Sequence, residues 1–261
     1  MLSLGASLIR HRQVMMVLAV LFPACVSAAP EEIQVYMDEF SEVGKVGLDL
    51  HTNYVSRVQS NPSASAEAST RHQFQLTPEL SYGIGEHWDT ALYWLTAHDP
   101  GGHPYTNGAK IRVRWRPAAP AEDGGWYTAV NVEMGRLSMR ATPDRTSSEL
   151  KLIAVKKSGP WTVGFNVNFD RPLQQHASEG TSMDIDTKVS YRIREGLQWG
   201  IEHYASLGEL RNRSGPSQAS RITYLVSDFE LGKWDFNVGI GRGSGNTNEK
   251  TVLKAIIGLP F

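Results

Sequence analysis

The chain has 261 residues and a formal net charge of −1, so no strong electrostatic field indicates a nucleic-acid partner. Its one cysteine, Cys25, lies near the amino terminus, which excludes a disulfide framework or a thiolate zinc site in the rest of the chain. Mean hydropathy is below zero, and beyond residue 30 no apolar run approaches the length of a membrane-spanning helix. No long linker divides the chain, which favours a single domain.

The amino-terminal residues have the pattern of a secretory signal. A cationic patch precedes the apolar run 14–22, and residues 26–28 fit the small-x-small cleavage rule, so residues 1–28 are predicted to be removed. One alternative is a membrane anchor, for which the apolar run is too short. The other is a lipoprotein acylated on Cys25, for which Pro23 makes a poor recognition sequence. Residues 29–43 are then predicted to be a periplasmic lead-in.

Alternation with a period of two recurs from residue 44 to the end, and no segment carries a helical stripe. In the clearest case, the apolar residues Trp161, Val163 and Phe165 alternate with Thr162 and Gly164. The alternation is blurred in the third and sixth segments, near residues 89–93 and 153–155. The predicted strands are residues 44–56, 72–82, 87–97, 107–117, 126–137, 147–157, 160–169, 182–194, 197–206, 219–230, 233–241 and 250–261.

The links between these strands alternate in length. Long polar links follow the odd strands and short ones follow most even strands, with 118–125 as the exception. Outer-membrane barrels have short periplasmic turns, longer external loops and an even strand number. A soluble sandwich or lipocalin-type barrel, the alternative, has no reason to collect its long loops at one end. The sequence therefore predicts an all-β fold: residues 44–261 form one up-and-down transmembrane barrel of about 12 strands, with both termini periplasmic.

The carboxy terminus supports this fold. Residues 259–261 end the last alternating segment on an aromatic residue, Phe261, and this resembles the closing strand of bacterial outer-membrane barrels. The resemblance implies that Phe261 is an assembly signal, that the barrel-assembly machinery is a partner during biogenesis, and that the protein resides in the lipid bilayer of the outer membrane of a Gram-negative cell.

In a membrane barrel the polar face of each strand lines the lumen. Four cations at a spacing of two, Lys110, Arg112, Arg114 and Arg116, form the most distinctive set. They could be an anion-attracting stripe along a channel, or a structural ladder paired with Asp89 and Glu133 on the neighbouring strands. The near-balance of lumen charges favours the ladder. The candidate lumen-lining residues are Lys110, Arg112, Arg114, Arg116, Glu79, Glu133, Arg192, Glu202, Tyr204 and Lys254.

Catalytic and metal-binding alternatives have weak support. An outer-membrane lipid hydrolase would need His203 and Ser206 to meet, but three residues apart on a strand they point to opposite faces. His98, Asp99 and His103 share one predicted external loop and could bind Zn²⁺ or Cu²⁺, although loop histidines are usually solvated. No nucleotide-binding motif is present. We expect a protein that is not an enzyme and has no metal or cofactor.

Several short motifs lie along the chain: residues 32–36, 47–54, 78–83, 108–110 and 252–254. With them, the chain resembles a poorly characterised proteobacterial family of outer-membrane barrels, similar to the barrel group of the phenol-degradation meta pathway. The expected function is a narrow, porin-like passive pore or a binding barrel for small solutes, with anions as one candidate class. The alternative is a closed barrel that is structural or binds a partner without transport.

Overall fold

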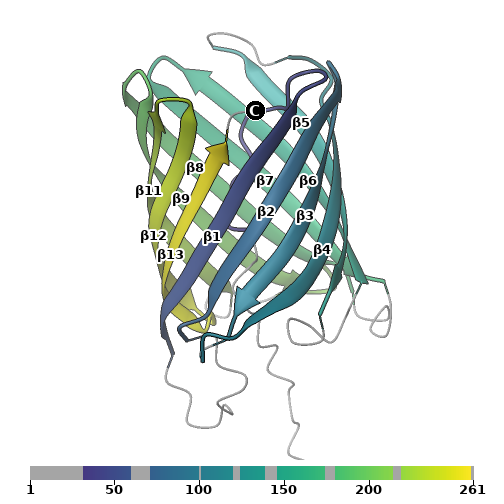
Figure 1. Ribbon diagram of the computed structural model, residues 1–261, viewed down its shortest axis with the longest axis vertical. Coiled ribbons are helices and arrows are strands. Elements are labelled where there is room, and N and C mark those ends of the chain that lie inside the picture. Colours follow the sequence, from purple (N-terminus) through teal and green to yellow (C-terminus); the bar gives the residue numbers. More distant parts are fainter. Residues whose placement is uncertain are drawn as a thin grey trace, which may run out of the picture.

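The computed structural model describes residues 32–59, 71–99, 101–119, 124–138, 146–173, 180–213 and 219–259. These residues form one closed antiparallel barrel (Figure 1). The predicted signal peptide and Phe261 lie outside the described residues. No helix within the described ranges is long and apolar enough to cross a membrane.

Twelve long strands build the wall, and the two-residue strand β10 (Asn212–Arg213) pairs antiparallel with the end of β9. Their bounds are β1 Val46–Val58, β2 Phe74–Gly85, β3 Trp88–His98, β4 Pro104–Trp115, β5 Trp126–Leu137, β6 Thr146–Ser158, β7 Trp161–Pro172, β8 Ser182–Arg194, β9 Leu197–Glu209, β11 Ser220–Leu231, β12 Trp234–Gly245 and β13 Glu249–Leu259. Each corresponds to one predicted strand, so the predicted 12-stranded all-β fold is confirmed.

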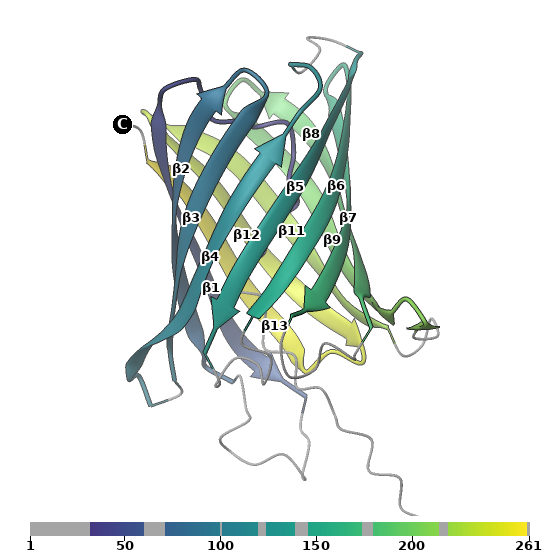
Figure 2. The same cartoon turned by 90° about the vertical axis from the view of Figure 1, so that its right-hand side faces the viewer.

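The strands follow an up-and-down order around the barrel. Each long strand pairs antiparallel with the next in the chain, and β13 pairs with β1, which closes the sheet and leaves no long open edge. The turns after β2, β6, β8 and β11 are short and lie at the same end as the start of β1 and the end of β13. We call this the short-turn end and the opposite one the loop end (Figure 2).

Glycine makes three of these short turns possible. Gly159, Gly196 and Gly232 have φ values of 58°, 67° and 69°, in the left-handed region where a side chain would be strained. Each joins two strands through a link of only two residues, and tight hairpin links of this length require such backbone angles. The positions of these glycines in the sequence therefore determine where the hairpins turn at this end.

The two faces of the wall differ in polarity as the alternation predicts. On β4, Ile111, Val113 and Trp115 are exposed on the outer face, whereas Arg112 and Arg114 are buried on the inner face. Outward aromatic rings pack in pairs near the short-turn end, such as Trp161 and Tyr191, whose ring centroids lie 4.8 Å apart. An apolar outer face with aromatic rings near its rim is the surface of a barrel that faces lipid.

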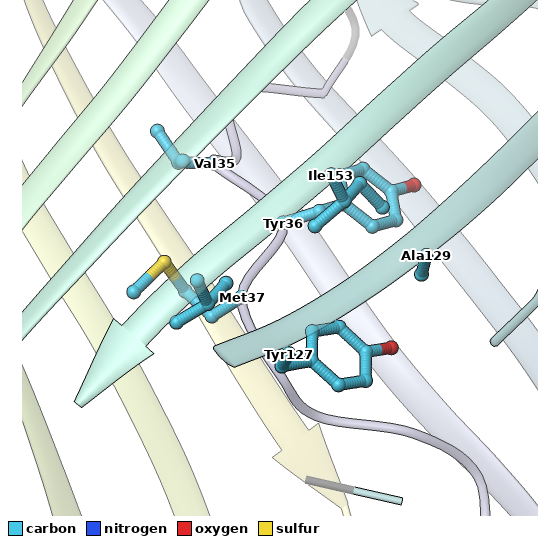
Figure 3. Packing of buried hydrophobic residues seen from close by; sticks show 7 residues of the cluster. Val35, Tyr36, Met37, Tyr127, Ala129 and Ile153 are labelled. Carbon is cyan, nitrogen blue, oxygen red and sulfur yellow. The ribbon is translucent and has the colours of Figure 1, made fainter. Parts of the chain in front are cut away.

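The segment that precedes β1 lies inside the barrel. Its side chains Ile33, Val35, Tyr36 and Met37 are all buried, with exposed fractions between 2% and 6%. Figure 3 shows three of them beside Tyr127, Ala129 and Ile153 of the wall. The sequence predicts a periplasmic lead-in for residues 29–43, but in the structure its residues 33 and 35–37 lie in the lumen, where their apolar side chains have apolar partners. We call residues 32–43 the lumen segment.

Candidate functional site

Polar side chains of β1 to β4 form one compact network on the inner wall, which we call the arginine cluster: His51, Glu79, Asp89, Arg112 and Arg114. Glu79 is central, with its Oε1 3.0 Å from Arg112 Nη1 and its Oε2 2.9 Å from His51 Nε2. Arg114 holds Asp89 through two nitrogen–oxygen contacts, of which Nε to Oδ1 measures 3.2 Å. All five residues are buried, so these charges are neutralised within the wall.

The pairing of Arg112 differs from the predicted ladder. Arg112 lies directly across from Glu133 of β5, yet its shortest ion-pair contact is with Glu79, two strands away in the other direction, and its Nη2 lies 3.9 Å from Asp89 Oδ1. On β3, Ala91 lies across from Arg112 and Tyr93 lies across from Glu79, so the guanidinium reaches Glu79 diagonally, past the small side chain of Ala91. Glu133 instead accepts hydrogen bonds from Asn131 Nδ2 at 2.7 Å and from the Tyr36 hydroxyl at 3.2 Å. Arg114 pairs with Asp89, as the ladder predicts.

A second network lies on β8, β9, β11 and β13, centred on Glu202; we call it the lysine cluster. Glu202 accepts from the Tyr204 hydroxyl at 2.7 Å, lies 3.3 Å from Lys188 Nζ and also pairs with Lys254. Lys188 Nζ is 2.8 Å from Asp228 Oδ1 as well. Lys188 and Lys254 thus share the carboxylates around them, and Lys254 still has an N–H donor for another partner.

Several polar groups of the wall bind the lumen segment, and the remaining N–H donor of Lys254 is one of them. Lys254 Nζ donates to the Ile33 carbonyl at 2.9 Å. Asn166 of β7 clamps the backbone of Tyr36: its Oδ1 accepts from the Tyr36 N–H at 2.7 Å, and its Nδ2 donates to the Tyr36 carbonyl at 2.9 Å. Asp89 accepts from the Ser41 N–H at 3.2 Å. The wall therefore binds the segment through backbone groups that no strand ladder satisfies.

Cations surround the two aromatic rings of the segment. Lys151 Nζ lies 4.1 Å from the centre of the Tyr36 ring, and the Arg112 guanidinium lies 5.6 Å from it. The Phe40 ring lies 4.0 Å from the guanidinium of Arg116. Such cation–ring contacts stabilise by about 0.5–2 kcal/mol, more where water is excluded. The cations of β4 and β6 are thus contacts for the segment.

Apolar patches of the inner wall complete the binding surface. Ile33 packs against Val55, Ile222, Tyr224, Val226 and Val252, which come from β1, β11 and β13. Val35, Tyr36 and Met37 pack against Tyr127, Ala129, Ile153 and Val155 of β5 and β6. Burying an aliphatic side chain of this size contributes about 1.5–3 kcal/mol. The lumen is thus polar in its charged clusters and apolar where the segment lies.

The predicted lumen-lining residues do not all belong to these networks. Glu79, Arg112, Arg114, Glu133, Glu202 and Lys254 are buried on the inner wall, and Tyr204 is half-buried beside Glu202. Lys110 and Arg116, at the two ends of the β4 column, are half-buried. Arg192 is exposed at the end of β8 and donates to the Gly159 carbonyl at 3.3 Å, away from both clusters.

The residues of the catalytic alternative are not brought together. His203 lies on the outer face of β9, where its Nδ1 is 2.8 Å from the Thr223 hydroxyl. Ser206 lies on the inner face, opposite Asp184 of β8. The regular strand therefore separates the histidine from the serine.

The loop histidines form no complete metal centre in the part of the chain that the structure describes, where no group of three possible metal ligands occurs. Asp99 binds only its own loop: its Oδ1 accepts from the His103 backbone N–H at 2.9 Å. This hydrogen bond lowers the pKa of the Asp99 carboxyl below its usual value. His98 packs against Phe74 instead, with ring centroids 5.8 Å apart.

Sequence reasoning missed the lumen segment and its clamp, Asn166. The signal was present as apolar residues on the predicted inner face, where a water-filled lumen would have polar ones. Ile153 and Val155 on β6 and Tyr93 and Leu95 on β3 are buried inside the barrel. The blurred alternation of these two strands indicates that something apolar covers them.

The fold and lumen together define this protein as an outer-membrane-type β-barrel. No family model and no curated protein matches the chain in sequence. Solved structures do match. An outer-membrane channel from Pseudomonas putida F1 has a TM-score of 0.59 at 11% identity, over 88% of this chain and 100% of that one.

Two porins have the same architecture. The KdgM porin, solved in complex with disordered oligogalacturonate, matches with a TM-score of 0.54 at 9% identity, over 82% of this chain and 99% of that one. The NanC porin matches with a TM-score of 0.54 at 12% identity, over 82% and 98% of the two chains. At these identities the likeness shows the fold, which is that of outer-membrane channel barrels.

Proposed function

We propose that this protein resides in an outer membrane and is a narrow passive pore for small solutes. The observation that carries the proposal is a closed 12-stranded barrel with an apolar outer face and charged clusters inside. Channels and porins share this fold. An interior of twelve strands is wider than the eight-stranded kind that side chains alone fill. From the short motifs we also propose that the protein is related to the barrel group of the phenol-degradation meta pathway.

Anions are the proposed favoured class of solute. The buried cations Arg112 and Arg114 are neutralised by Glu79 and Asp89, so they contribute little to selectivity. Lys110 and Arg116 also have partners within the protein, but they are half-buried at the two ends of the same column, so water and a passing anion reach them more readily than they reach the buried arginines. We therefore place the selectivity of the pore on these two residues and not on the buried arginines.

The test is conductance in planar bilayers with a salt gradient. The purified protein is expected to conduct and to favour anions, and Lys110→Gln/Arg116→Gln is expected to shift the reversal potential toward cations. Arg194→Gln/Lys233→Gln, which removes two exposed charges near the short turns, is the matched control and should shift it less. Equal shifts in the two variants would contradict the assignment.

A closed structural barrel is the second candidate, and the lumen segment is the observation that favours it. Ile33, Val35, Tyr36 and Met37 are buried between opposite parts of the wall and so reduce the open section of the lumen. A folded protein that inserts but conducts at no voltage, with or without the segment, would support this alternative and reject the pore.

A further inference from the structure

We propose that the lumen segment is a tethered plug: it blocks the pore when it lies in the lumen and opens the pore when it swings out at the short-turn end. The inference rests on the proposed pore function and adds its regulation. Residues 33–42 take no part in any strand, so no ladder of backbone hydrogen bonds fixes them to the wall. Every wall strand, in contrast, is bonded to two neighbours along its length.

The contacts that hold the segment are of a kind that can break and re-form. They are hydrogen bonds between the backbone of the segment and the side chains of Asn166, Lys254 and Asp89, together with the Tyr36–Glu133 hydrogen bond, the Asp38–Lys157 ion pair and side-chain packing. The wall keeps its own partners without them: Glu79 and Asp89 stay paired with arginines, and Glu202 stays paired with lysines. Loss of the segment therefore leaves a charged lumen whose ion pairs are still satisfied.

A hinge joins the segment to the wall at the short-turn end. Val43 forms an isolated bridge with Gly83, and Gly44 follows with a φ of 73° and nothing within 4 Å of where a Cβ would lie. Gly83, in contrast, is sterically constrained, because a Cβ there would lie 2.1 Å from the Glu42 carbonyl oxygen.

The charge of the segment gives the motion a direction. Residues 32–43 contain Glu32, Asp38, Glu39 and Glu42 and no lysine or arginine. A potential that is positive at the short-turn end pulls this negative segment outward, toward its tether, and the opposite potential drives it inward. Opening should therefore depend on the sign of the voltage, which a rigid constriction would not produce.

Two variants test the plug. The first lacks residues 32–41 and keeps Val43 and Gly44. It is expected to show a several-fold larger single-channel conductance and to lose the dependence on voltage polarity. Heat-modifiable migration on gels checks that its barrel is folded. The proposal is overturned if the folded variant has the conductance and voltage response of the parent.

The second variant locks the segment in place. A Cβ at Gly164 would lie 2.3 Å from Met37 Sδ, so position 164 lies beside the Met37 side chain, and Met37→Cys/Gly164→Cys is designed to join the two positions by a disulfide. Cys25 is the only native cysteine and belongs to the predicted signal peptide, so no other thiol competes. The oxidised protein should stay in the low-conductance state at both polarities, and reductant should restore switching. Each single cysteine variant is the control for the effect of oxidant.

The outcomes separate this inference from the pore itself. Conductance that is the same before and after oxidation, and unchanged by the deletion, rejects the plug and keeps the pore. No conductance in any variant, including the folded deletion, rejects the pore. If the deletion variant does not fold, the disulfide pair still decides, since its two states are compared within one folded protein.

Discussion

The arginine cluster and the Asn166 clamp on the lumen segment both provide partners for buried polar groups, but the partners differ in kind. In the arginine cluster, the buried charges of Arg112 and Glu79 satisfy each other within the wall, from strand to strand. At the clamp, Asn166 directs both its amide groups at the backbone of Tyr36, which belongs to no strand. The first arrangement stabilises the barrel and the second stabilises only the docked segment, so a change in each should alter a different property.

The largest expected effect is on the stability of the barrel. Arg112→Met leaves the Glu79 carboxylate buried without its guanidinium, and breaking a buried ion pair on one side costs about 3–5 kcal/mol. We expect a much lower midpoint for urea unfolding in lipid vesicles. The double variant Arg112→Met/Glu79→Met removes both charges and should regain most of the loss. An equal loss in the single and double variants would show that packing, not charge, is what Arg112 supplies.

A smaller effect, and on a different property, is expected at the clamp. Asn166→Ala removes two hydrogen bonds to Tyr36, each with a net contribution of about 0.5–1.5 kcal/mol. The open fraction in single-channel records should rise, while the urea midpoint of the barrel changes little. Asn166→Asp keeps the acceptor for the Tyr36 N–H but turns a carboxylate oxygen toward the Tyr36 carbonyl, so it should raise the open fraction at least as much as alanine does. A large fall in the urea midpoint would show that the clamp belongs to the barrel.

The same contrast explains what the sequence could predict. Alternation on β4 predicts which of its side chains face inward, because one strand sets its own period, and β4 places Arg112 and Arg114 as expected. The partner of Arg112 could not be predicted, because it depends on register and on the small Ala91 that lies between β2 and β4. The order of neighbouring strands can be predicted from the sequence, but a contact between side chains on two strands that flank a third cannot.

The lumen segment shows a second limit. Residues 33–37 are apolar enough to need cover, and β3 and β6 carry apolar side chains on the face that lines the lumen. These two facts are visible in the sequence separately, since both strands have blurred alternation. Their connection is not visible, because the segment makes no ladder and leaves no periodic signal at its binding surface. An apolar inner face in a predicted membrane barrel is therefore an indication of an internal plug.

The smallest expected effect is at the rim of the segment, where Asp38 pairs with Lys157. The Lys157 side chain is 39% exposed, so water and salt screen the pair, and a pair of this kind contributes about 0–1 kcal/mol. Asp38→Asn should raise the open fraction slightly at low salt, and the difference should vanish near 1 M salt, where the screening length is about 3 Å. Glu42→Gln removes the same charge from an exposed position of the segment and serves as the control.

If the two variants change the open fraction equally, the effect is on the total charge that moves with the segment. A larger change for Asp38→Asn shows that the pair itself holds the docked position, and hence that even the exposed end of the segment contributes to closure.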